Sequence, residues 1–263
     1  MNWRIKIVIV DTHTHIGETI GFLNVNNSID AFLSKMNQVH IDYAINAPVV
    51  SMMQHGFSDA ITLSKRLFEQ SQGKIMSYFV FEPQYTAECI RLIEQNQHHS
   101  NIFKGIKIHP AFHQTDADDD AYLPIFQLAN RLKLPILSHS WDVSDYNHSQ
   151  KHSFPDKFIR HIEEFPNVNL ILGHSGGRHH GIISAKKLAQ KYQNVYLDLA
   201  GDIYFCGLVD SLIASCSSKK ILFGTDMNWF EPSPQLGMVL SSKMSSLEKK
   251  DILYDNAIKL FNI

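Results

Sequence analysis

The segment Asp11-Thr12-His13-Thr14-His15 places two histidines two positions apart after a short apolar run. In a β-strand, residues at this spacing point to the same side, so the rings of His13 and His15 can converge on one point. Two neutral imidazoles in that arrangement form half of a site for zinc, manganese or iron. Asp11 has the same parity and could orient them. In a chain with 15 histidines the motif can also arise by chance.

Three further polar side chains end other apolar runs. His139 follows Pro-Ile-Leu-Ser, His174 follows Leu-Ile-Leu-Gly, and Asp226 follows Ile-Leu-Phe-Gly-Thr. Each one alone is explained as an ordinary polar residue at the start of a loop. If the runs are strands of a parallel barrel, however, their carboxyl ends meet on one face, where such barrels build active sites. The five side chains together therefore predict one shared site.

The elements that would position these residues alternate along the whole chain. Short apolar runs are separated by stretches of helical periodicity, which predicts parallel βαβ units rather than hairpins. An open doubly wound sheet shares this alternation, but eight runs in 263 residues favour a (β/α)8 barrel, also called a TIM barrel. We found no linker or internal repeat, so we expect one domain over residues 1–263. The predicted strands are 5–10, 43–50, 75–81, 102–108, 135–138, 168–172, 195–199 and 221–223.

Composition limits the function classes. The 24 Lys and Arg nearly balance the 26 Asp and Glu, so the chain lacks the basic field of a nucleic-acid or anionic-membrane binder. Three scattered cysteines predict neither a disulfide framework nor a thiolate metal cluster. No apolar window suits a signal peptide or a membrane span of about 20 residues. We expect a cytoplasmic protein with a small-molecule substrate; its oligomeric state, a homo-oligomer included, is left open.

Motifs in a fixed order cover nearly the whole chain: DTHTH at 11–15, GIKIHP at 105–110, LPILSH at 134–139, LILGHSGG at 170–177, NVYLDLAG at 194–201, ILFGTD at 221–226 and NAIKLF at 256–261. In this order they resemble the amidohydrolase superfamily, in its amidohydrolase-2 branch of metal-dependent hydrolases and decarboxylases. The resemblance implies a (β/α)8 barrel with a metal site at the carboxyl ends of the strands.

The resemblance also implies ligands for a divalent metal, expected to be Zn²⁺ with Mn²⁺ or Fe²⁺ as alternatives, and one ion or two. The residues that would hold or adjoin it are His13, His15, His139 and Asp226. His174 would bind a second metal or polarise the substrate. Some relatives carry a carboxylated lysine where Lys107 stands; the alternative is a plain lysine paired with an acid of the site or with an anionic substrate.

Further residues are candidates for contact with the substrate. Arg178 could pair with a substrate carboxylate, although a solvated arginine explains it equally well. Trp141 could form a wall of the pocket or simply pack. The two histidines that flank the exit of the fourth predicted strand could also line the pocket: His109 and His113.

The main prediction for the reaction is metal-assisted hydrolysis of an amide, lactone or other ester bond. A bound metal would activate water, Asp226 would take its proton and pass it to the leaving group, and His174 would stabilise the oxyanion.

The alternative reaction is non-oxidative decarboxylation or hydration of an aromatic or unsaturated carboxylic acid, in which the metal chelates the substrate and Asp226 protonates carbon. A cluster of arginines would favour it, and Arg178 is the one candidate that we can place at the mouth. A catalytically silent binding module is the third interpretation; retention of all five polar strand ends argues against it.

Overall fold

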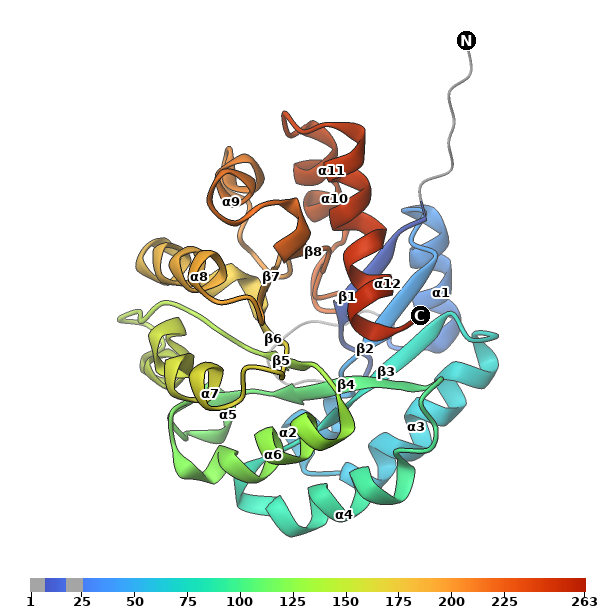
Figure 1. Ribbon diagram of the computed structural model, residues 1–263. Helices are drawn as coiled ribbons and strands as arrows, with labels where there is room; N and C mark the ends of the chain where they lie inside the picture. Colours follow the sequence, from blue (N-terminus) through green and yellow to red (C-terminus); the bar gives the residue numbers. More distant parts are fainter. Residues whose placement is uncertain (1–7, 18–25) are drawn as a thin grey trace.

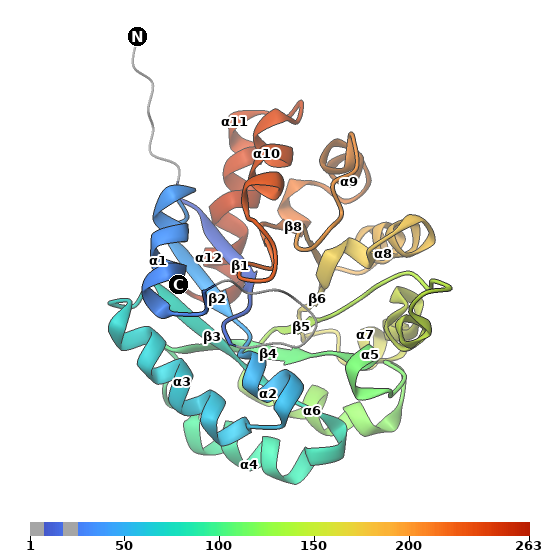
Figure 2. The same ribbon diagram turned by 180° about the vertical axis from the view of Figure 1, so that it is seen from behind.

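The computed structural model describes residues 8–17 and 26–263. Within them, eight parallel strands follow one another in chain order in a single sheet, and helices surround it (Figures 1 and 2). The strands are β1 (Val10–Thr14), β2 (Tyr43–Asn46), β3 (Ile75–Val80), β4 (Phe103–Ile108), β5 (Ile136–Ser138), β6 (Leu170–Leu172), β7 (Val195–Asp198) and β8 (Ile221–Leu222).

The sheet closes between β1 and the segment that follows β8. The backbone N–H of Thr12 donates to the carbonyl of Phe223 at 2.9 Å, and that of Asp226 donates to the carbonyl of His13 at 2.9 Å. Thr14 also forms a parallel bridge with Met227. The fold is therefore a (β/α)8 barrel, and the prediction from the sequence is confirmed.

Local sequence signals explain where some of the helices begin. For example, α1 starts after Ser28, whose side chain accepts a hydrogen bond from the N–H of Ala31, and it buries Phe32 and Met36. The helices are α1 (Ile29–Gln38), α2 (Val49–Gln54), α3 (Phe57–Gln70), α4 (Thr86–Asn96), α5 (Pro110–His113), α6 (Leu123–Leu132), α7 (Ile159–Glu164), α8 (His179–Lys191), α9 (Leu208–Cys216), α10 (Ser233–Ser241), α11 (Ser246–Lys250) and α12 (Asn256–Phe261). None of the helices in the described residues is both long and apolar enough to cross a membrane.

Half of the first predicted strand, residues 5–7, lies outside the described residues, and of the rest only Val10 is in a strand. The observed β1 begins at Val10 and includes most of the DTHTH motif, because its backbone pairs with β2 on one side and with the segment after β8 on the other. His13 thus lies within a strand rather than after one. The run predicted at 43–50 is a strand only to Asn46, and α2 follows it.

The interior of the barrel is filled below the site. The hydroxyl of Tyr78 on β3 donates to the carbonyl of Thr12 on β1 at 2.7 Å, so this ring crosses the barrel. Gly105 on β4 makes room for it, since a Cβ there would lie 3.0 Å from the Tyr78 ring. Lys107 lies two residues further along β4 and therefore on the same side. This packing makes the base of the site from residues of three strands, β1, β3 and β4.

Candidate metal centre

Three buried side chains from β1 and the end of β8 bring their donor atoms together. Oδ1 of Asp226 lies 3.2 Å from Nε2 of His13 and 3.3 Å from Nε2 of His15. None of the three residues is more than 3% exposed. Among the described residues, this Oδ1 nevertheless has no hydrogen-bond partner. Buried oxygens are normally satisfied, so the convergence fits a divalent cation with two imidazole ligands and one carboxylate ligand. We call these three residues the metal-facing set.

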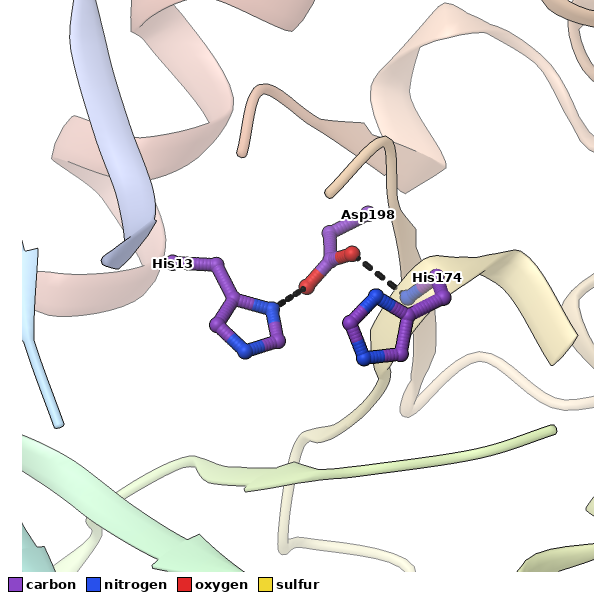
Figure 3. A group of neighbouring side chains, drawn as sticks. All are labelled: His13, His174 and Asp198. Atoms are coloured by element: carbon purple, nitrogen blue, oxygen red, sulfur yellow. Dashed lines mark hydrogen bonds and ion pairs between the residues drawn. The ribbon is translucent and has the colours of Figure 1, made fainter. Parts of the chain in front are cut away.

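The far side of each imidazole is held by another group. Nδ1 of His15 lies 3.1 Å from the carbonyl of Ala47, which can only accept, so this nitrogen carries the proton. The ring of Trp229 stacks on His15 at 3.8 Å. Nδ1 of His13 lies 2.8 Å from Oδ2 of Asp198 (Figure 3). Metal-binding histidines commonly have such a partner on their second nitrogen.

Electrostatics favours the protonation states that bind a metal. Burial, together with the charge of Lys107, lowers the pKa of His13 to about 4, and burial also lowers the pKa of His15. Both rings are therefore neutral at pH 7. Burial alone would raise the pKa of Asp226, but the rings of His13 and His174 outweigh it and keep this pKa below its usual range. Neutral imidazoles and an ionised carboxylate are the forms that coordinate cations.

His139 lies beside the metal-facing set in a different environment. Its Nε2 is 2.8 Å from Oε1 of Gln150 and its Nδ1 is 3.0 Å from Nε2 of His174. Nearly parallel rings lie on its faces: His109 at 4.0 Å and Trp141 at 5.9 Å between centroids, with 7° between the planes in each case. Phe112 stacks on His109 at 3.7 Å. We call Phe112, His109, His139 and Trp141 the ring stack.

His174 contacts both the metal-facing set and the ring stack. Its Nδ1 lies 3.0 Å from the carbonyl of Ala200 and 3.6 Å from Oδ2 of Asp226. The backbone of His174 is left-handed, with φ of 59°. Gly201 packs against it so closely that a Cβ would lie 2.7 Å from Nδ1 of His174. The predicted convergence of residues from β1, β5, β6 and β8 is therefore present in the structure.

Lys107 extends into the same site. Its Nζ lies 2.8 Å from Nε2 of His13, and the residue is 1% exposed. Burial lowers its pKa to about 8, against the opposing charges of Asp226 and Asp198. The lysine thus carries a proton at neutral pH and donates it toward the metal-facing nitrogen of His13.

Two other residues that were predicted to contact the substrate, Arg178 and His113, lie further from the metal-facing set. Arg178 is paired with Asp202 at 2.6 Å and stands 5.7 Å over the Trp141 ring, at the outer end of the ring stack. His113 does not join the metal-facing set. Its Nδ1 lies 2.7 Å from the hydroxyl of Tyr122, and burial lowers its pKa to about 3.

The sequence analysis did not identify Asp198 as a site residue, although it lies within the motif NVYLDLAG at 194–201. It ends β7 just as other polar residues end their strands, and that position was the available signal. Asp11 supports the site through the backbone rather than through the rings. It accepts hydrogen bonds from the N–H of His13 at 3.2 Å and from the hydroxyl of Thr225 at 2.5 Å, which ties β1 to the end of β8.

Comparisons with solved structures show the same barrel in other proteins. A 5-carboxyvanillate decarboxylase from Novosphingobium aromaticivorans, solved with manganese, is 14% identical with a TM-score of 0.74, covering 98% of this chain and 97% of that one. A 2,6-dihydroxybenzoate decarboxylase from Rhizobium is 15% identical (TM-score 0.73, coverage 97% and 98%). A 4-oxalomesaconate hydratase from Rhodopseudomonas palustris is 16% identical (TM-score 0.69, coverage 97% and 96%).

No curated protein sequence matches the chain at a significant level. The profile of the amidohydrolase family, however, matches residues 81–263, which is more than half of the chain. This range begins within the loop after β3 and includes four of the polar strand ends described above, those of β5 to β8. With the barrel and a His/Asp cluster suited to a divalent metal in place, the chain belongs to the amidohydrolase family.

Proposed function

We propose that this protein is a metal-dependent enzyme that decarboxylates or hydrates an aromatic or unsaturated carboxylic acid. The observation that carries the proposal is the meeting of three metal-facing atoms, from His13, His15 and Asp226, with the buried ammonium of Lys107 2.8 Å from one of them. A metal and an ammonium side by side suit a substrate that brings a carboxylate. Similar barrels that carry names of decarboxylases and of a hydratase support the same reaction class.

The metal-facing set would hold the ion, with His139 as a further ligand and His174 available to a second ion. Bound there, a divalent metal supplies charge that polarises a substrate oxygen. We propose Zn²⁺ or Mn²⁺, the latter because a similar barrel was solved with manganese; Fe²⁺ is compatible with the same ligands. His139 would have to exchange its contact with Gln150 or with His174 to coordinate the ion.

The protonation states assign different tasks to the charged residues. Asp226 is ionised, which suits a ligand and a proton acceptor. Carbon protonation after loss of CO₂ needs a group that carries a proton, and Lys107, with its pKa lowered to about 8, carries one at neutral pH. We propose Lys107 as an unmodified lysine in this role, and His174 as the group that polarises the substrate. A mass increase of one carboxyl group in the native protein would support the carboxylated form instead.

The proposed substrate contacts lie along the ring stack. His109 and Trp141 are stacked with His139, Arg178 stands over Trp141, and His113 ends α5, the short helix that follows His109. We propose that residues 1–263 act as one catalytic domain in the cytoplasm on a small molecule, without nucleic acid or membrane, as a monomer or homo-oligomer.

Hydrolysis of an amide, lactone or other ester bond is the second candidate. The ionised state of Asp226 favours it, because a carboxylate beside the metal-facing atoms can take a proton from water. The hydrolytic and decarboxylating reactions differ in what they release.

A substrate panel separates the candidates. Protein loaded with Zn²⁺ or Mn²⁺ would be incubated with hydroxylated benzoic acids, unsaturated dicarboxylic acids, lactones and amides, while CO₂ release, proton release and loss of the conjugated double bond are followed. We expect CO₂ release or water addition with an acid substrate, and its loss in Asp226→Asn. Turnover of lactones or amides alone would contradict the main proposal, and a metal content near zero would contradict both.

A further inference from the structure

Asp198, the last residue of β7, contacts two elements of the site at once. Its Oδ2 lies 2.8 Å from Nδ1 of His13, and its Oδ1 accepts a hydrogen bond from the backbone N–H of His174 at 2.7 Å (Figure 3). The same Oδ1 accepts from the N–H of Ala200 at 3.1 Å. The side chain is fully buried. Asp198 thus joins β1 to the turn after β6.

These contacts determine where His13 carries its proton. The Oδ1 of Asp198 is used by two backbone N–H groups, which leaves Oδ2 as an acceptor for Nδ1–H of His13. On the opposite side of the ring, Lys107 can only donate, and its Nζ lies 2.8 Å from Nε2. Both neighbours therefore favour the Nδ1–H tautomer, in which the lone pair of Nε2 faces Asp226.

The backbone contact has a separate effect on His174. His174 and Ser175 have φ of 59° and 50°, a left-handed conformation that side-chain-bearing residues rarely adopt. Asp198 fixes this turn from two sides, because its own carbonyl also accepts a hydrogen bond from the hydroxyl of Ser175 at 2.6 Å. The turn is what directs the His174 ring toward Asp226.

We propose that Asp198 is a positioning residue that fixes the tautomer of His13 and the left-handed turn carrying His174. Its consequence for metal affinity rests on the proposed function, whereas its effect on the tautomer does not. The competing interpretation is that Asp198, His13 and His174 bind a second metal ion, since their potential ligand atoms lie within 4.8 Å of one another. That interpretation requires Oδ2 to release Nδ1 of His13.

The isosteric variant Asp198→Asn tests the proposal directly. Its amide carbonyl would remain the acceptor for the two backbone N–H groups, so its NH₂ would face Nδ1 of His13. That nitrogen would then have to accept, and the proton would move to Nε2, where Oδ1 of Asp226, 3.2 Å away, can accept it. Asp255→Asn is the matched control, because it removes the same charge from an exposed ion pair with Lys250.

Two measurements compare these variants with the unmodified protein. Ring ¹⁵N chemical shifts of metal-free protein report the tautomer of His13, and calorimetric titration with Zn²⁺ reports affinity and stoichiometry. We expect Asp198→Asn to convert His13 to the Nε2–H form and to weaken Zn²⁺ binding by about 10- to 100-fold. Asp255→Asn should match the unmodified protein in both. An unchanged tautomer, or a loss of one Zn²⁺ from a stoichiometry of two, would overturn the proposal.

The unmodified protein provides a test that does not depend on how the variant folds. In metal-free protein, His13 should be the Nδ1–H tautomer; an Nε2–H tautomer would refute the proposal outright. If the unmodified protein binds no Zn²⁺ or Mn²⁺, the proposed function fails, and the tautomer measurement still decides the role of Asp198.

Discussion

The two sides of the site use the same residue type in opposite ways. In the metal-facing set, Nε2 of His13 and of His15 point to a shared centre with Asp226, whose Oδ1 has no hydrogen-bond partner in the part of the chain that the structure describes. In the ring stack, His139 has both nitrogens in contact with protein groups and rings on both faces. On the first side, Lys107 contacts Nε2 of His13, but three donor atoms still converge on one point. On the second side, both nitrogens of His139 are held by protein groups away from that point.

The difference follows from the elements that carry each side. His13 lies in β1, where backbone pairing with both neighbours fixes the direction of the side chain. His109 and His139 follow the ends of β4 and β5, where loop residues such as Gln150 can reach their rings. A histidine at a strand end is therefore not sufficient evidence for a ligand; the partners of its two nitrogens decide.

The largest effect is expected from His15→Ala, which removes one of the three converging donors. We expect the affinity for Zn²⁺ to fall at least roughly 100-fold, because the remaining two donors cannot hold the ion in a closed set. Calorimetric titration measures it, with His98→Ala as control because His98 is an exposed histidine on the surface. Retention of full affinity would mean that the ion binds elsewhere.

The next largest effect is expected from a change in the backbone at Gly201, which lies against His174 and Asp226. Gly201 and Gly207 both have positive φ, 84° and 74°, but a Cβ on Gly201 would lie 2.7 Å from Nδ1 of His174 and 3.3 Å from Oδ2 of Asp226. A Cβ on Gly207 would meet no atom of residues 8–17 or 26–263 within 4 Å.

Gly207→Ala should therefore show only the backbone strain, about 1–2 kcal/mol of unfolding free energy. Gly201→Ala should lower the free energy of unfolding by more than this, and it should also weaken Zn²⁺ binding about 10-fold. Urea unfolding and titration measure the two quantities. Equal behaviour of the two variants would show that the close approach at Gly201 does not matter for the site.

A smaller effect on metal affinity is expected for His139→Ala. Because both nitrogens of His139 already have partners, its removal should weaken Zn²⁺ binding by less than about 10-fold. Gln150→Ala, which frees Nε2 of His139, should change the affinity in the opposite direction or leave it unchanged. A loss with His139→Ala as large as that with His15→Ala would make His139 a full ligand, and the contrast between the two sides of the site would disappear.

The sequence contained enough information for the barrel and for the positions of the polar strand ends. The two-residue period of a strand predicted that His13 and His15 share a side, and parallel strands explain why His174 and Asp226 join them. It did not contain the contact between His139 and Gln150, which depends on the path of a loop. The left-handed backbone of His174 was also beyond prediction, because tertiary hydrogen bonds to Asp198 maintain it against local preference.

His113→Gln is expected to leave the metal affinity unchanged. The variant tests whether this buried ring near the ring stack is a neutral packing group. Burial lowers the pKa of His113 to about 3 in the folded protein, against about 6.5 when unfolded. A lowered pKa means that the stability it contributes is complete above pH 6.5 and is lost as pH falls toward 3. Between these two pH values, protonation of this ring should lower the free energy of unfolding by about 1.4 kcal/mol for each pH unit.

Glutamine can still hydrogen-bond the hydroxyl of Tyr122 but does not titrate, so His113→Gln should remove this dependence. Urea unfolding at several pH values between about 6.5 and 4 measures it, and the exposed His179→Gln controls for the loss of a histidine as such. For His113→Gln, the slope of the free energy of unfolding against pH should decrease by the equivalent of about one proton. For His179→Gln, the slope should stay as in the unmodified protein. Identical slopes would mean that His113 gains its proton without unfolding, so that burial does not lower its pKa and the ring is not a neutral packing group.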